Sequence, residues 1–219
     1  MELEKIKEIE KDVEQKFKNE YSGHDWWHIK RVINLSIKLA RREGADEKKS
    51  HIIALLHDLF DEKIFDIKNK EEEIKKFIVS RKLDKLFTPN TIDDIVCDLL
   101  NLSFRGKFDN QKLSLEGKIV QDADRLDAIG AIGIARVFAY GGNKKHAIYV
   151  PNKKIVTQLT EKQYMNNDYD QIAHFYIKLL KIKDNLNTES ARRIAKNRHK
   201  FMEEFLQQFF YEWNDDIED

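Results

Sequence analysis

Cysteine, proline, glycine and long apolar runs are all scarce in this 219-residue chain. Its single cysteine, Cys97, excludes an internal disulfide, which fits a reducing cytoplasm, and it excludes a zinc site built from thiolates. Uncharged apolar runs such as Ile52–Leu56 are far shorter than the roughly 20 residues that span a bilayer. The beginning, MELEKIKEIEKDVEQ, is charged throughout and lacks the apolar segment of a signal peptide. We therefore expect a cytoplasmic protein with no membrane partner.

Net charge is absent as well, because 39 Lys and Arg residues balance 39 Asp and Glu residues. The sequence pI is about 7.1, and with 36% charged residues and a mean hydropathy of −0.65 the surface should be strongly solvated. Proteins that coat nucleic-acid polymers usually carry a strong basic excess. The balance therefore argues against a nucleic-acid polymer as partner, and it leaves the oligomeric state open.

The eight glycines and two prolines leave long stretches without a helix breaker. Apolar residues recur at helical spacing in these stretches, as in Ile6, Ile9, Val13 and Phe17. We therefore predict an all-α fold. The expected helices are one at the N-terminus, one from about Ile29 to Gly44, one from about Asp46 to Phe60, and others at roughly 70–83, 90–104, 114–140, 168–183 and 188–213.

Residues 141–160 differ from the rest because they mix Gly, Pro, Asn and β-branched residues. We expect a long loop here, with a short hairpin as an alternative. No internal repeat or low-complexity linker divides the chain. The prediction is one domain over residues 1–219, with a core at about 21–140, this loop at 141–160, and C-terminal helices within 161–219.

The His57-Asp58 pair closes an expected helix whose preceding residues are almost all apolar. Two ionisable side chains at the end of a buried helix need partners, because burying them unpaired is costly. Asp58, Asp61 and Glu62 stand at i, i+3 and i+4, so a continued helix would place three carboxylates on one face. Such carboxylates repel one another unless a cation neutralises them. A divalent cation and a solvated acidic helix end both remain open.

His28 lies on the same helical stripe as Val32, Leu35 and Leu39, which directs it toward the core. An inward histidine is either a hydrogen-bonded core residue or a ligand, and the stripe alone does not decide between them.

Asp122 and Asp124 stand two residues apart, which is about 200° around a helix, so they cannot share a face. Asp124 lines up with Val120 and Asp127 and is followed by a run of small residues, which suits close helix packing. An aspartate in such a helix needs a partner, and the two alternatives are a metal and a salt bridge to a basic residue such as Arg125.

Together these candidates make a set of two imidazoles and two carboxylates. Mixed nitrogen and oxygen ligation suits Mn²⁺, Fe²⁺, Co²⁺, Ni²⁺ or Zn²⁺, whereas Mg²⁺ prefers oxygen alone.

The arrangement of His28, His57-Asp58 and Asp124 resembles the H…HD…D pattern of the HD-domain metal-dependent phosphohydrolases. The surrounding segments SGHDWWHIKRV, ALLHDLFDE and QDADRLDAIGAIGIAR look like those of the small stand-alone bacterial HD hydrolases, as does the later HFYIKLLKIKD. The likeness spans roughly Tyr21 to the C-terminus. It implies an HD-domain helical bundle with a C-terminal helical extension.

The resemblance also implies roles for particular residues. His28, His57, Asp58 and Asp124 would bind one divalent metal ion, with Mn²⁺ expected first and Mg²⁺, Fe²⁺, Co²⁺, Ni²⁺ or Zn²⁺ as alternatives, while Asp122 matches no ligand position. Asp61 and Glu62 correspond to the acidic catalytic pair of phosphoester-cleaving relatives. A second metal is disfavoured because no histidine occurs between His57 and His146.

The expected substrate is a small phosphorylated molecule, most readily a nucleotide, because the family resemblance points to phosphate chemistry. Arg31 and Arg125 are the expected substrate-binding residues, since phosphoryl transfer needs positive charge on the non-bridging oxygens. Lys178 and Lys181 are weaker candidates. Hydrolysis of a (d)NTP to its monophosphate and pyrophosphate is the first expectation. The alternatives are 5′-nucleotidase action on a (d)NMP, and a non-catalytic nucleotide sensor or interaction module with a structural metal.

Overall fold

The computed structural model describes residues 2–20, 23–61, 67–102, 112–153, 155–157, 160 and 169–214. These residues form helices and contain no strand, so the all-α prediction is confirmed. None of the described helices combines the length and the apolar character that a bilayer crossing requires. In chain order the elements are α1 (Glu2–Lys16), α2 (Trp26–Glu43), α3 (Glu47–Leu56), α4 (Lys70–Ser80), η1 (Leu83–Lys85), α5 (Pro89–Asn101), α6 (Leu115–Asp127), α7 (Gly130–Lys144), α9 (Gln171–Ile177), η2 (Leu179–Asn185) and α10 (Glu189–Trp213).

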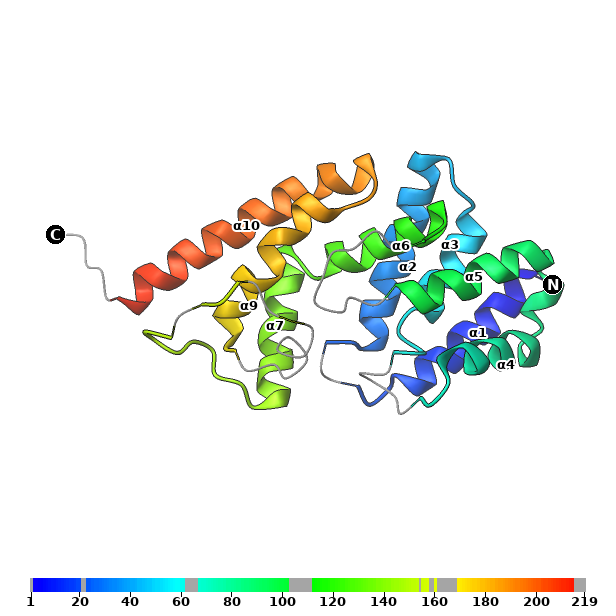
Figure 1. The fold of residues 1–219 in the computed structure, drawn as a ribbon, viewed down its shortest axis with the longest axis horizontal. Coiled ribbons are helices and arrows are strands. Elements are labelled where there is room, and N and C mark those ends of the chain that lie inside the picture. Colours follow the sequence, from blue (N-terminus) through cyan, green and yellow to red (C-terminus); the bar gives the residue numbers. More distant parts are fainter. Residues whose placement is uncertain are drawn as a thin grey trace.

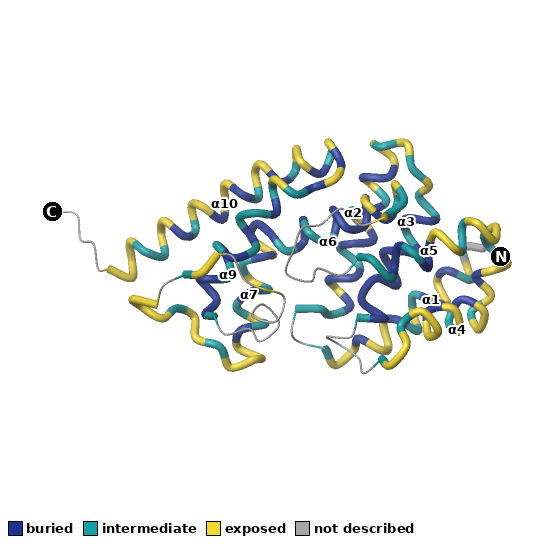
Figure 2. The backbone as a smooth tube through the Cα atoms, viewed as in Figure 1, coloured by how far each residue is buried: buried dark blue, intermediate teal, exposed yellow. Residues whose placement is uncertain are grey.

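The helices form an elongated bundle in which α1 and the C-terminal part of α10 lie at opposite ends (Figure 1). Helices α1 to α6 gather toward the N-terminal end, and α7, α9 and α10 gather toward the other. At the centre, α2 packs against α3 and α6, and α3 packs against α6. Figure 2 shows that the most continuously buried backbone lies in this central group. The three helices that carry the candidate site residues therefore make up the core of the molecule.

The C-terminal half of helix α3 is buried on all sides, because every residue of Ile52–Leu56 is inaccessible to solvent. Removing each Ile or Leu side chain from water contributes about 1.5–3 kcal/mol, which offsets the cost of ordering this helix. The helix ends at Leu56, with His57 as its C-cap, so a firmly packed segment leads directly into the His57-Asp58 pair.

Helix α2 begins where the sequence offers an N-cap. The Asp25 side chain accepts a hydrogen bond from the backbone N–H of His28 at 2.7 Å, which satisfies one of the first free amides of the helix. The helix ends before Gly44, as predicted, and its buried side carries Ile29, Val32 and Leu39. The same cap therefore fixes the first turn and the backbone of His28.

The predicted single helix over 114–140 is wrong, because the chain leaves α6 after Asp127 and starts α7 at Gly130. Gly130 has a φ of +77°, which a residue with a side chain rarely adopts. Gly133 packs against the carbonyl of Ala128, so that a Cβ there would lie 2.2 Å from its oxygen. Part of the small-residue run thus serves a tight turn between two helices rather than one continuous packing face.

Substitution of Gly133 tests this turn, and Gly142 in the same helix is a matched control. Gly133→Ala is expected to lower the free energy of unfolding by about 1–3 kcal/mol, because the new methyl group meets backbone that cannot move aside. Gly142→Ala has nothing within 4 Å and is expected to be neutral or to stabilise by up to about 1 kcal/mol. Urea unfolding of both variants measures the difference. Equal stabilities would show that the turn relaxes freely.

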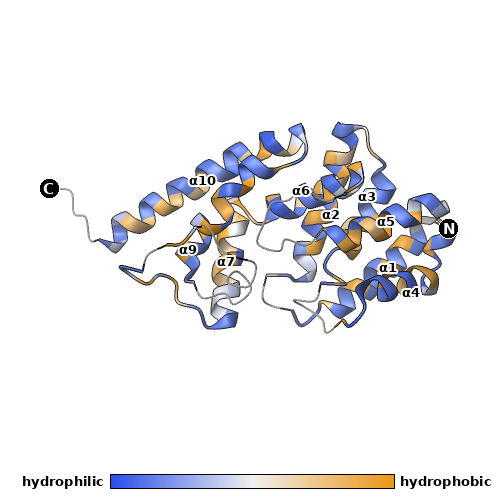
Figure 3. Ribbon diagram, viewed as in Figure 1, coloured by the Kyte–Doolittle hydropathy of each residue, from blue (hydrophilic) through white to orange (hydrophobic). Residues whose placement is uncertain are grey.

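The C-terminal part differs from the sequence prediction in two further places. Helix α7 continues to Lys144, so the first residues of the predicted 141–160 loop are helical. The predicted helix at 168–183 is divided, since α9 ends at Ile177 and a 3-10 helix, η2, follows the irregular residue Lys178. Helix α10 forms as expected, and its buried residues recur at helical spacing between hydrophilic ones (Figure 3).

Candidate metal centre

Four predicted site residues meet where α2, α3 and α6 pack together. His28 lies in the first turn of α2, His57 and Asp58 directly follow α3, and Asp124 lies in the last turn of α6. His28, His57 and Asp58 are buried, whereas the side chain of Asp124 is 43% exposed. The group therefore has a closed inner side and an open side toward solvent.

The donor atoms of these residues are spaced like ligands of one ion. His28 Nε2 lies 3.2 Å from His57 Nε2, 3.4 Å from Asp58 Oδ2 and 3.4 Å from Asp124 Oδ1. His57 Nε2 lies 3.4 Å from Asp58 Oδ1. Two donors that each lie about 2.1 Å from one ion are about 3.0 Å apart at a right angle and about 3.4 Å apart at the tetrahedral angle. The donors fall into two overlapping groups, His28, His57 and Asp124, and His24, His28 and Asp58, which could hold a metal ion with nitrogen and oxygen ligands.

Hydrogen bonds at Nδ1 leave Nε2 of His28 and of His57 as the nitrogen that can bind a metal. Nδ1 of His28 lies 2.7 Å from Asp127 Oδ2, and Nδ1 of His57 lies 2.7 Å from the backbone carbonyl of Ala54. An oxygen acceptor at Nδ1 places the proton there and leaves the lone pair on Nε2. Each ring is thus held in the tautomer and orientation that metal binding needs.

The electrostatics of the group favour positive charge at its centre. Burial disfavours the charged form of His57, but the carboxylates of Asp58 and Asp124 outweigh this and raise its pKa to about 9. Burial likewise acts against the charged form of Asp58, yet His57 and His24 hold the pKa of this carboxyl well below its usual range. A divalent cation supplies such positive charge in place of a proton.

Asp127 is a functional residue that the sequence reasoning did not identify. Its carboxylate is buried and accepts hydrogen bonds from Arg31 Nε at 2.7 Å, Arg31 Nη2 at 3.0 Å and Arg136 Nη1 at 3.1 Å, besides its contact with His28. Burial opposes its ionisation, but His28 and Arg31 lower the pKa of Asp127 well below the ordinary value. A usable signal existed, since Asp127 follows Asp124 by three residues and shares its helical face.

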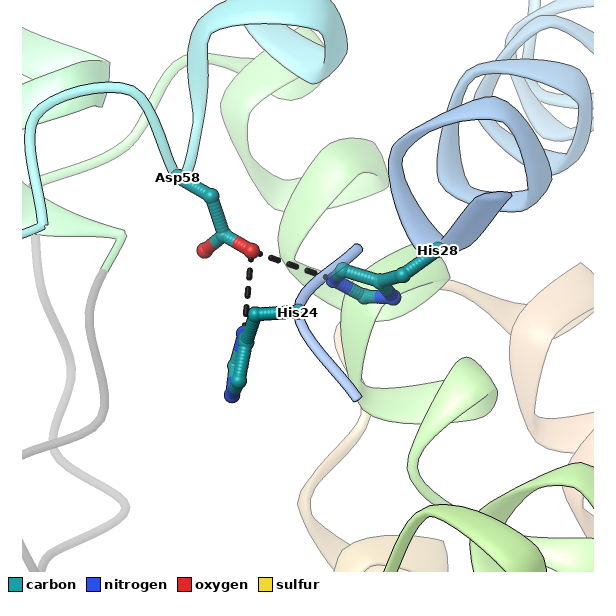
Figure 4. Close-up of side chains that lie close together, drawn as sticks. All are labelled: His24, His28 and Asp58. Atoms are coloured by element: carbon teal, nitrogen blue, oxygen red, sulfur yellow. Dashed lines mark hydrogen bonds and ion pairs between the residues drawn. The ribbon is translucent and has the colours of Figure 1, made fainter. Parts of the chain in front are cut away.

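His24 is the second residue that sequence reasoning missed. It lies just before α2, and its Nδ1 is 3.0 Å from Asp58 Oδ2, the same oxygen that faces His28 (Figure 4). The rings of His24 and His28 meet edge to face with centroids 5.5 Å apart. Helical periodicity carries no information for a residue in a loop, and the His24-Asp25 dipeptide is too short to indicate a role.

The predicted acidic pair is placed differently from the expectation. Helix α3 ends at Leu56, so the expected continuation of this helix through Asp58 and Asp61 is wrong. Asp61 is half-buried, and its backbone N–H donates to the carbonyl of Asp58 at 3.2 Å within a turn. Glu62 lies outside the described residues.

The predicted phosphate-binding residues already have protein partners. Arg31 binds both oxygens of Asp127, and Arg125 Nη1 donates to the backbone carbonyl of Asn185 at 2.6 Å.

The two candidate lysines differ in their surroundings. Burial lowers the pKa of Lys178 to about 8, and the charges of Arg136 and Arg125 add to this effect, while Asp124 acts in the opposite direction. Lys181 donates to the carbonyl of Thr157 at 2.5 Å. Lys178 is therefore the lysine whose charge is coupled to the site.

Asp122 faces away from this group. Its two oxygens accept hydrogen bonds from the backbone N–H groups of Asn187 and Thr188, each at 2.8 Å, just before α10 begins. The two aspartates of α6 thus serve opposite sides of the helix, as their 200° separation requires.

Comparison with known proteins agrees with this geometry. A family model described as HD domain matches residues 26–129. The protein YpgQ of Bacillus subtilis is 38% identical over 210 residues, which cover 94% of this chain and 93% of YpgQ. The chain belongs to the HD domain family.

Solved structures of HD proteins share the fold over nearly their whole length. A crystal structure of an HD-superfamily hydrolase from Bacillus thuringiensis has a TM-score of 0.73 and 39% identity, covering 98% of this chain and 99% of that one. A structure from Lactobacillus plantarum has a TM-score of 0.81 and 37% identity, with 96% and 97% covered. YpgQ in complex with ADP has a TM-score of 0.74 and 34% identity, with 95% and 94% covered. Membership of the HD superfamily supports a hydrolase, and the His and Asp clusters could hold a metal ion.

Proposed function

We propose that this HD protein is a metal-dependent phosphohydrolase that cleaves a nucleoside triphosphate to its monophosphate and pyrophosphate. The observation that carries the proposal is the convergence of His28, His57, Asp58 and Asp124, whose neighbouring donor atoms lie 3.2–3.4 Å apart. The imidazole and carboxylate donors suit Mn²⁺, which we expect first, as well as Fe²⁺, Co²⁺, Ni²⁺ or Zn²⁺. A nucleotide as substrate is supported by YpgQ, a relative whose structure contains ADP.

The chemistry divides between the metal and the side chains around it. When bound, a divalent metal polarises a phosphate oxygen and lowers the pKa of water, so that a nucleophile is available near neutral pH. Asp61, one turn beyond Asp58, would accept the proton of the attacking water, with Glu62 as the other candidate for this role. Such a general base typically contributes 10²–10⁴-fold to the rate.

Positive side chains on the open side would hold the phosphate groups. Arg31 binds Asp127 through Nε and Nη2, and in the proposal its remaining amino group contacts a non-bridging oxygen. Arg125 and Lys178 would complete the phosphate contacts, and the pKa of Lys178 is lowered chiefly by burial, with Arg136 and Arg125 adding to the effect. An anionic phosphate relieves the repulsion among these groups.

A nucleotide panel tests the proposed function. The protein is stripped with EDTA, refilled separately with Mn²⁺, Mg²⁺, Co²⁺ and Zn²⁺, and incubated with ribo- and deoxyribonucleoside tri-, di- and monophosphates. We expect turnover only in the refilled samples, with a triphosphate as the best substrate and pyrophosphate as the product identified by chromatography. The EDTA-treated sample without added metal is the control.

Other outcomes of this panel would replace the proposal. Orthophosphate released from monophosphates alone would indicate a 5′-nucleotidase. Tight nucleotide binding without turnover under every metal would indicate a sensor rather than an enzyme.

A further inference from the structure

His24 stands at the candidate metal centre but lies outside both the H…HD…D pattern and the matched segment 26–129. Its Nδ1 is 3.0 Å from Asp58 Oδ2, which is the separation expected for neighbouring ligands at a right angle around one ion. Figure 4 shows the rings of His24 and His28 approaching this oxygen from two directions. Its side chain is 38% exposed, so it borders the open side of the site.

The loop that carries His24 is fixed on both sides of the residue. The carbonyl of Gly23 accepts a hydrogen bond from Arg136 Nε at 2.8 Å, and the φ of +92° at Gly23 favours glycine at this position. On the other side, Asp25 caps α2 by accepting from the backbone N–H of His28. His24 is therefore held in place between two anchored residues, as a ligand position requires.

The guanidinium of Arg136 also connects the loop of His24 to the buried side of the candidate metal centre. Arg136 donates through Nη1 to Asp127, whose carboxylate in turn holds Nδ1 of His28. One residue of α7 thus orients both the backbone next to His24 and the partner of His28. Outer contacts of this kind are the usual support of metal-binding imidazoles.

Two groups of donors with mutual separations within 4.8 Å occur among the described residues, and they overlap. One consists of His24, His28 and Asp58, and the other of His28, His57 and Asp124. The two groups share His28, whose Nε2 has one lone pair and can bind one ion. They therefore describe a single centre with more donors than the four that the sequence pattern names.

We propose that His24 is a further ligand of the metal ion, which is then held by three imidazoles and bordered by His24 on the side open to solvent. This inference rests on the metal centre of the proposed function. As a ligand, His24 would offer the lone pair of Nδ1 to the ion and carry its ring proton on Nε2.

Pulsed EPR of the Mn²⁺-loaded, substrate-free protein tests the proposal by counting coordinated imidazole nitrogens. We expect three in the wild type and two in His24→Ala, and a fall in Mn²⁺ affinity of at least about 10- to 100-fold by titration calorimetry. His24→Gln retains a side chain that can hydrogen-bond to Asp58 but has no imidazole, so it should behave like His24→Ala. His146→Ala removes a part-exposed histidine that contacts Gln171 and Tyr140, and it should match the wild type.

The variants distinguish a failure of the role proposed for His24 from a failure of the proposed metal centre as a whole. An unchanged nitrogen count in His24→Ala, or wild-type affinity in His24→Gln, would overturn the role of His24 as a ligand. Asp58→Ala, measured in parallel, should lose Mn²⁺ whether or not His24 is a ligand. If Asp58→Ala also bound Mn²⁺ like the wild type, the proposed centre would be wrong as a whole. Unfolding in EDTA shows that each variant is folded.

Discussion

Asp58→Ala is expected to abolish Mn²⁺ binding and nucleotide hydrolysis together. The carboxylate of Asp58 faces three imidazoles, with His24 and His28 at one oxygen and His57 at the other. Its removal takes away a donor and the negative charge that brings these rings around a cation. Loss of an outer partner of a ligand already costs about 10- to 100-fold in affinity or activity, so loss of Asp58 should exceed that range.

Thermal unfolding with and without metal provides the measurement. A ligand present at 100 times its Kd stabilises the folded state by about 2.7 kcal/mol, so Mn²⁺ should raise the Tm of the wild type and leave that of Asp58→Ala unchanged. Asp98→Asn is a matched control, because Asp98 is a buried aspartate that accepts from Ser114. Ser114 lies about 15 Å along α6 from Asp124. This control should lose stability but keep the response to Mn²⁺. A retained response in Asp58→Ala would contradict the assignment.

Asp127→Asn should cause the largest loss of stability among substitutions around the site. The carboxylate is buried between Arg31, Arg136 and His28, and the amide would turn a donor toward groups that are themselves donors. Breaking a buried ion pair by removing one partner costs about 3–5 kcal/mol. Because the Arg31 side chain is 37% exposed, we expect the lower end of this range. Mn²⁺ affinity should also fall about 10- to 100-fold, since His28 loses its orienting partner.

Urea unfolding in EDTA at several pH values tests the electrostatic origin of this effect. The pKa of Asp127 is depressed in the folded state, so its contribution is fully present above the unfolded pKa of about 3.9 and is lost as the pH falls toward the folded pKa. The stability difference between wild type and Asp127→Asn should therefore be constant near neutrality and shrink below about pH 4. A difference that persists unchanged in acid would point to packing instead. Asp98→Asn, which does not touch this network, again provides the comparison.

Helical periodicity was sufficient to orient His28 and to separate Asp122 from Asp124. The stripe through Val32, Leu35 and Leu39 directs His28 inward, and the structure buries it completely. The angle between Asp122 and Asp124 predicts that they serve different partners, and the structure places one against α10 and the other beside His28. Both inferences need only the geometry of one helix, which the local sequence determines.

Features that depend on contacts between distant segments could not be predicted in the same way. Asp127 pairs with Arg31 across 96 residues, and Arg136 with the loop at Gly23 across 113 residues. The turn at Ala128–Gly130 was missed because alanine and glycine are compatible with both a packed helix and a break between helices. The expected helix through Asp58 and Asp61 was wrong because α3 ends at Leu56 rather than near Phe60.

The position of Arg136 has a consequence for the modularity of the protein. The HD segment at 26–129 contains all four residues of the H…HD…D pattern. Arg136, which hydrogen-bonds to both Asp127 and the loop of His24, lies in α7 after that segment ends. A fragment of residues 26–129 would keep these four residues but lose Arg136 and His24. The smallest transplantable unit is therefore longer than the matched HD segment at both ends, and chimeras of such proteins should exchange α7 and the residues before α2 together with that segment.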